Sequence, residues 1–160
     1  MPRSVSEWER VYTVTDYWDG PRAGVADFGG VPHIYVAIFN QELGEWDPED
    51  RYELSPLPPN LLSAVQEDWA IWRRYELALK TGRIPIPESE EKWGALSEDR
   101  PRRAELRRKL AGALVIDPSR RTVLRGEFRP VLSTAAPPPL GVMKELEVRW
   151  ADSAPATDLD

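Results

Sequence analysis

The sequence has no cysteine and a single histidine, His33, among its 160 residues. Without thiols the chain can form no disulfide, no thiolate metal site and no cysteine nucleophile. A histidine-dependent triad or general base would have to use His33, and no Gly-x-Ser-x-Gly segment supplies a partner serine. The glycines fit neither the dinucleotide-binding nor the P-loop spacing. We therefore predict no catalytic residue, no cofactor and no bound metal, and the balance leans away from an enzyme.

Long hydrophobic runs are also missing. No stretch approaches the roughly 18 uninterrupted apolar residues of a membrane span. The first ten residues, MPRSVSEWER, lack the apolar segment of a secretory signal. The sequence therefore predicts a cytoplasmic protein that does not associate with membranes.

What is present is an ordinary globular composition with an uneven charge distribution. Apolar residues make up 41% and charged residues 30%, and the net charge is −6. Residues 100–129 hold ten basic and three acidic residues, a net +7, so the remainder of the chain carries −13. The basic residues are Arg100, Arg102, Arg103, Arg107, Arg108, Lys109, Arg120, Arg121, Arg125 and Arg129.

Runs of β-branched, aromatic and alternating residues predict strands near both ends of the chain. The N-terminal ones are residues 11–15, 24–28, 31–39 and 51–54, and the C-terminal ones are 122–132 and 145–150. In the strand 31–39 the even positions are uniformly apolar, so we expect that face to meet the core.

Two helices are predicted between these groups of strands. The first begins at the N-cap Asn60 and runs to about Thr81, with Gly82 as its stop and with an apolar stripe that includes Trp69 and Trp72. The second begins at Ser97 and ends before residues 117–118, Asp-Pro.

The order of strands, helices and strands predicts an α+β fold. We expect an antiparallel β-sheet, made from the N- and C-terminal strands, packed against the two central helices. Residues 1–151 would form a single domain, followed by a disordered acidic tail at 152–160.

Three segments carry a resemblance to other proteins. The segment YTVTDYWDGPRAGVA at 12–26, with EDWAIW at 67–72 and RGEFR at 125–129, resembles a family of uncharacterised bacterial proteins. The resemblance extends to about Arg129 and implies a bacterial source. The family has no known activity, so the resemblance assigns no functional residue.

Tryptophans in polar contexts are the first candidate site residues. Trp8, Trp46 and Trp93 each have charged neighbours, and an exposed tryptophan beside charge is typical of an interface. The alternative is that each one anchors its own loop to the core. Four arginines of the basic segment, Arg100, Arg103, Arg107 and Arg108, join them as candidate partner-binding residues.

These residues favour a non-enzymatic protein-interaction module, such as a subunit or accessory factor of a bacterial assembly, whose partner is another protein. One alternative is a nucleic-acid-binding protein that uses the basic segment 100–129. A second is a cation-dependent hydrolase that uses the N-terminal carboxylates of Asp16, Asp19 and Asp27, although aspartates of this kind also serve turns.

Overall fold

The computed structural model describes residues 7–132 and 136–152. These residues form two compact units. The barrel unit holds the chain up to Leu57, Val115–Pro130 and the residues from Leu146 onward. The helical unit holds Pro58–Leu114 and Val131–Glu145.

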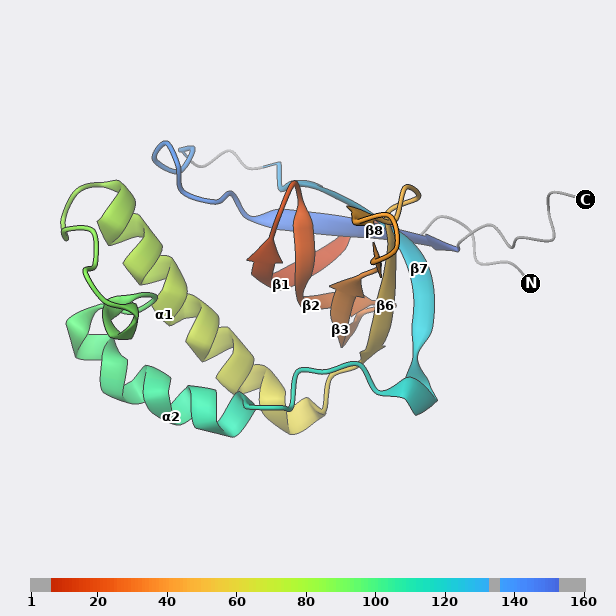
Figure 1. Cartoon of the computed structure of the whole chain (residues 1–160), viewed down its shortest axis with the longest axis horizontal. Helices are drawn as coiled ribbons and strands as arrows, with labels where there is room; N and C mark the ends of the chain where they lie inside the picture. The colour runs from red at the N-terminus through yellow and green to blue at the C-terminus, as the bar shows by residue number, and fades with distance from the viewer. Residues whose placement is uncertain (1–6, 133–135, 153–160) are drawn as a thin grey trace, which may run out of the picture. The chain divides into compact units, whose positions relative to one another are not determined.

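Six antiparallel strands close the barrel unit in the order β1-β2-β3-β6-β7-β8, with β8 paired to β1 (Figure 1). Register shifts along β1 mark bulges, which bend a strand and allow a sheet to curl. The strands are β1 (Glu9–Tyr17), β2 (Pro21–Phe28), β3 (Val31–Ala37), β6 (Arg51–Pro56), β7 (Thr122–Pro130) and β8 (Leu146–Asp152). A separate two-stranded hairpin pairs β4 (Phe39–Asn40) with β5 (Glu45–Trp46).

The predicted α+β class is confirmed, and so is a sheet built from strands at both ends of the chain. The expected arrangement was a simple sheet packed against the two helices, however, and the sheet closes into a six-stranded barrel instead. Asp152 was assigned to the tail but ends β8, and residues 153–160 lie outside the described part of the chain.

Aromatic residues fill the barrel. Tyr35 and Trp150 have no exposed surface, and Tyr52 and Phe128 pack beside them. The Tyr35 hydroxyl donates to Thr13 O at 2.9 Å, and Trp150 Nε1 donates to Asp27 O at 2.9 Å. Each buried polar atom of these two rings therefore has a partner, as burial requires.

The prediction for the strand 31–39 identified only one of the two faces that carry buried side chains. The cluster inside the barrel takes Tyr35 and Ala37 from the odd positions of β3. Ile34, an even position, is also buried, on the opposite face of the strand. Both faces of β3 carry apolar side chains, so periodicity alone could not select the inner one.

The helical unit contains α1 (Leu62–Lys80) and α2 (Arg100–Leu110) (Figure 1). Both predicted helices are present, but their starts differ. Asn60 lies in the short 3₁₀ helix η1 (Pro59–Leu61), and Ser97 lies in η3 (Ser97–Asp99). In the described residues no side chain caps either helix. Two further 3₁₀ turns are η2 (Glu90–Lys92) and η4 (Pro118–Arg120). None of the helices in the described residues is both long and apolar enough to cross a membrane.

A buried carboxylate anchors the second segment of the helical unit. Glu76 in α1 is 7% exposed; its Oε1 accepts from Arg73 at 2.5 Å, and its Oε2 accepts from the backbone N of Met143 at 3.1 Å. Trp69 and Trp72 are only half-buried, whereas Ile71 and Tyr75 are fully buried. The most buried face of α1 therefore lies beside the predicted stripe of Trp69 and Trp72 and does not coincide with it.

We expect Glu76→Ala to reduce the free energy of unfolding by about 1–3 kcal/mol, because it removes the acceptor of two donors at a buried position. Urea denaturation would measure the change. Glu105→Ala is the matched control, since Glu105 is an exposed ion-pair partner of Arg102 and should cost less than about 1 kcal/mol. Equal losses in the two variants would contradict the anchoring role of Glu76.

Candidate functional site

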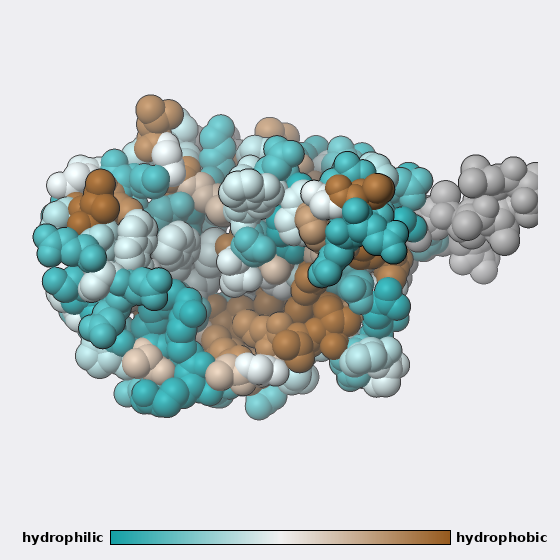
Figure 2. Space-filling view, viewed as in Figure 1, coloured by the Kyte–Doolittle hydropathy of each residue, from teal (hydrophilic) through white to brown (hydrophobic). Residues whose placement is uncertain are grey.

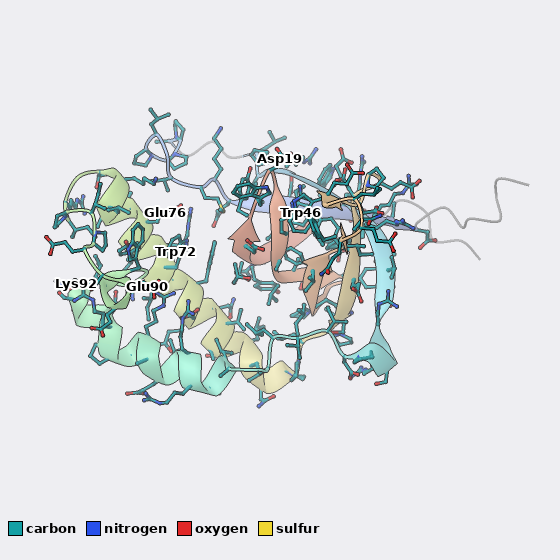
Figure 3. The ribbon with its side chains drawn as sticks, viewed as in Figure 1. Asp19, Trp46, Trp72, Glu76, Glu90 and Lys92 are labelled. Carbon is teal, nitrogen blue, oxygen red and sulfur yellow. The ribbon has the colours of Figure 1, made fainter. Side chains whose placement is uncertain are left out.

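Four of the seven predicted site residues line one hollow of about 430 Å³ in the helical unit. They are Trp93, Arg100, Arg103 and Arg107. The remaining lining comes from Trp72, Glu90, Glu91, Gly94, Ala95 and Ala104. We call this the arginine hollow. Trp72 from α1 and Glu90 from η2 lie close together beside it in Figure 3.

The spacing of the arginines along α2 brings them to the hollow. Arg100, Arg103 and Arg107 follow steps of three and four residues, so they share one face of the helix. Arg108 stands one position further round; it is exposed and does not line the hollow. The outer surface of α2 is strongly hydrophilic (Figure 2).

Two aromatic rings that line the hollow, Trp72 and Trp93, pack on a buried tyrosine behind them. Tyr75 is fully buried, with the ring of Trp72 at 5.6 Å and the ring of Trp93 at 6.2 Å between centroids. Burial is the main cause of a raised pKa at Tyr75. Trp93 itself remains 47% exposed, so one face of its indole is available to a ligand.

Arg103 ties the connector to α2. Its Nη1 donates to Trp93 O at 3.0 Å, and its Nε lies 3.7 Å from Asp68 Oδ1. Gly94 has a φ of +89°, and a Cβ there would lie 1.6 Å from Arg103 Nη1, so glycine leaves the space that the guanidinium fills. Burial, followed by the nearby charge of Arg107, lowers the pKa of Arg103. Arg103 is thus a fixed, largely desolvated cation in the lining of the hollow.

Arg100 connects the arginine hollow to a larger cavity. Its Nε is buried and has no hydrogen-bond acceptor among the described residues. It lines the hollow and also a cavity of about 680 Å³. The apolar lining of that cavity comes from Leu77, Ala78, Ile84, Pro85, Ile86, Pro87 and Leu96. Its charged lining comes from Arg74, Arg83, Lys92, Arg100, Glu88 and Glu98.

Trp8 and Trp46, the other two candidate tryptophans, lie in the barrel unit and not at the hollow. Trp8 stacks against Arg129 at 3.7 Å and against Arg149 at 4.8 Å. Trp46 packs on the barrel core. Both contacts match the alternative in which a loop tryptophan anchors its own segment.

The basic segment is divided and partly neutralised. Its α2 part lies in the helical unit, whereas Arg120 to Arg129 lie in the barrel unit. Arg102 makes two bonds of 2.7 Å to Glu67, and Arg121 and Arg129 pair with Glu53 and Glu147. Arg107, Arg108 and Lys109 are exposed and have no ion pair within the described part of the chain.

The N-terminal carboxylates do not form a metal site. Within the described residues no three of the histidine, aspartate and glutamate side chains gather as metal ligands. Asp16 and Asp19 are exposed at the β1–β2 turn, and Asp27 bonds to Tyr12 on β1. The Nδ1 atom of His33 lies 2.7 Å from Val31 O, so this ring bonds to the backbone of its own strand.

Sequence reasoning missed two residues. Trp72 was placed on the apolar stripe of the first helix and was not a candidate site residue, but it lines the hollow. Trp18 was not singled out, although it is 70% exposed. A signal for Trp18 existed, because it directly precedes the Asp19-Gly20 turn, where a side chain has little to pack against.

Comparisons of the chain with protein-family models, with curated proteins and with solved structures gave no match.

Proposed function

We propose that this chain is a non-enzymatic protein-interaction module whose arginine hollow binds an acidic segment of another protein. The observation that carries the proposal is the meeting of Trp93 with Arg100, Arg103 and Arg107 around one hollow. Tryptophan and arginine are among the residues most enriched at binding hot spots. Such a module would serve as a subunit or accessory factor of an assembly, and the bacterial origin rests on the family resemblance alone.

The charged residues around the hollow indicate the charge that a partner would carry. Three arginines line the hollow against Glu90 and Glu91. Arg108 and Lys109 add two exposed cations on the last turn of α2. A carboxylate entering the hollow would supply the acceptor that Arg100 Nε lacks, and satisfying a buried donor is favourable.

The neighbouring cavity specifies a second feature of the partner. Its lining includes Leu77, Ile84 and Leu96, and its volume falls in the range of ordinary binding pockets. Since Arg100 borders both spaces, a peptide could place a carboxylate at the arginines and an aliphatic side chain in the cavity. The proposed ligand is therefore an acidic segment that carries an aliphatic anchor.

Nucleic acid is the second candidate, favoured by Arg107, Arg108 and Lys109, which are exposed and have no ion pair with another described residue, and by the exposed ring of Trp93, which lines the hollow with Arg107. Single strands bind to such combinations of cations and stacking rings. Glu90 and Glu91 in the lining of the hollow oppose a phosphate backbone, and for this reason we place the acidic peptide first.

The test uses a fluorescein-labelled 12-residue peptide of glutamate, aspartate and leucine, with binding measured by fluorescence anisotropy at 150 mM salt. We expect Trp93→Ala and Arg107→Glu each to weaken binding by about tenfold or more, the loss typical of a hot-spot residue. Arg108→Glu is the matched control, because it makes the same charge change on the same helix outside the hollow and should have a smaller effect.

A labelled single-stranded 12-mer deoxyoligonucleotide gives the competing result. Tighter binding of the oligonucleotide than of the peptide, with a steep loss of affinity as salt rises, would favour nucleic acid instead. Equal effects of Arg107→Glu and Arg108→Glu would mean that the peptide responds to the overall positive charge of α2 and does not bind in the hollow.

A further inference from the structure

The barrel unit has an exposed apolar surface of its own, at the β1–β2 turn and the β4–β5 hairpin. Trp18 is 70% and Leu43 68% exposed, and Tyr17 next to Trp18 and Phe39 in the hairpin are exposed as well. We call these four side chains the aromatic end. Figure 2 shows brown, hydrophobic atoms ringed by teal where the hairpin projects.

A buried arginine joins the turn to the hairpin. Arg22 is 7% exposed; its Nε donates to Trp18 O at 2.6 Å and its Nη2 to Asp19 O at 3.0 Å. The same guanidinium stacks on the ring of Trp46 at 4.3 Å, and that ring packs edge-on against Phe39 at 4.8 Å. Asp19 and Trp46 accordingly lie at the same end of the barrel unit (Figure 3).

These contacts hold both segments in a fixed conformation. The turn closes with Trp18 N donating to Gly20 O at 2.9 Å. After the hairpin, the buried carboxylate of Asp47 accepts from the guanidinium of Arg51 at 2.7 and 3.0 Å. Side chains displayed on a rigid backbone lose less entropy on binding, which favours an interface.

The charge around the aromatic end is negative. Asp16 and Asp19 flank the exposed rings of the turn, and Glu42 and Glu45 flank Leu43. All four carboxylates are exposed, and none forms an ion pair with another described residue. Arg22 offsets only one of these four negative charges, and its guanidinium donates to backbone carbonyls and not to a carboxylate.

We propose that the aromatic end is a second docking surface, which binds a basic protein segment carrying an apolar side chain. Lysine or arginine side chains of the partner would pair with the carboxylates and stack on Trp18, and an apolar side chain would contact Tyr17 and Leu43. This surface selects the charge opposite to that selected by the arginine hollow. The chain would therefore contact two different partner segments and connect them.

The test compares two labelled 12-residue peptides, one of lysine, arginine and leucine, and the other with glutamate at each basic position. At 150 mM salt we expect Trp18→Ala to weaken binding of the basic peptide at least tenfold and to leave the acidic peptide unchanged. Trp93→Ala is the matched control with the same loss of an indole in the helical unit, and it should leave the basic peptide unchanged. Trp18 is exposed, so its replacement should not disturb folding.

A second measurement locates the contact. In protein labelled with 5-fluorotryptophan, the resonance that disappears in Trp18→Phe should shift when the basic peptide is added. Unaltered binding of the basic peptide by Trp18→Ala, or no shift of that resonance, would overturn the proposal. So would concentration-dependent self-association that Trp18→Ala abolishes, because the occupant would then be a second copy of the chain. Failure of the acidic peptide alone would count against the arginine hollow and not against this surface.

Discussion

Replacing Gly24 by alanine is expected to destabilise the barrel by about 3 kcal/mol or more. A Cβ on Gly24 would lie 2.1 Å from Thr13 O and 2.7 Å from the hydroxyl of Tyr35. The first of these atoms belongs to the backbone of the neighbouring strand, so the clash cannot be relieved by a side-chain rotation. If β1 moved to relieve this clash, the hydrogen bond from the Tyr35 hydroxyl to Thr13 O would also be disturbed.

Urea denaturation would measure this loss, and Gly29→Ala is its control. Gly29 has a φ of +64°, and a Cβ added there would have no other atom within 4 Å, so alanine meets backbone strain without crowding. Strain of that kind costs about 1–2 kcal/mol. A Gly24→Ala protein as stable as Gly29→Ala would show that β1 and β2 are not so closely apposed.

The elements that sequence reasoning predicted well are those with a strong local pattern. The helix 62–80 repeats its apolar residues at helical spacing and stops at Gly82, so both its type and its end were predictable. The closure of the barrel was not predictable in this way, because Glu9 pairs with Val148 across most of the chain. No local pattern distinguishes a curled sheet from an open one.

The candidate site was likewise predictable only where it depends on a local sequence pattern. Arg100, Arg103 and Arg107 share a helix face by their spacing, and this much follows from the sequence. The position of Trp93 against them depends on the path of the connector, which Gly94 and the bond from Arg103 to Trp93 O determine. The buried role of Arg22 was likewise invisible, since a charged residue next to a turn is ordinarily solvated.

Alkaline solution is expected to unfold the barrel through its buried tyrosines. Burial raises the pKa of Tyr52 to about 12 and holds the pKa of Tyr35 well above its usual value. Tyrosines in an unfolded chain ionise near pH 10. Below pH 10 both hydroxyls are neutral in either state, so their contribution to stability is fully present. Between pH 10 and 12 the unfolded chain ionises first, and Tyr52 alone would remove about 2 kcal/mol over this interval.

Urea denaturation at pH 8, 10 and 11.5 would measure the fall in the free energy of unfolding. Tyr52→Phe provides the comparison, because it removes one titrating hydroxyl and keeps the ring in the aromatic cluster. It also loses the bond from the hydroxyl to Pro21 O, so the variant should be less stable at pH 8. Its stability should nevertheless fall less steeply above pH 10 than that of the parent chain. Parallel curves for the two proteins would mean that the Tyr52 hydroxyl already reaches solvent, which is incompatible with a closed and filled barrel.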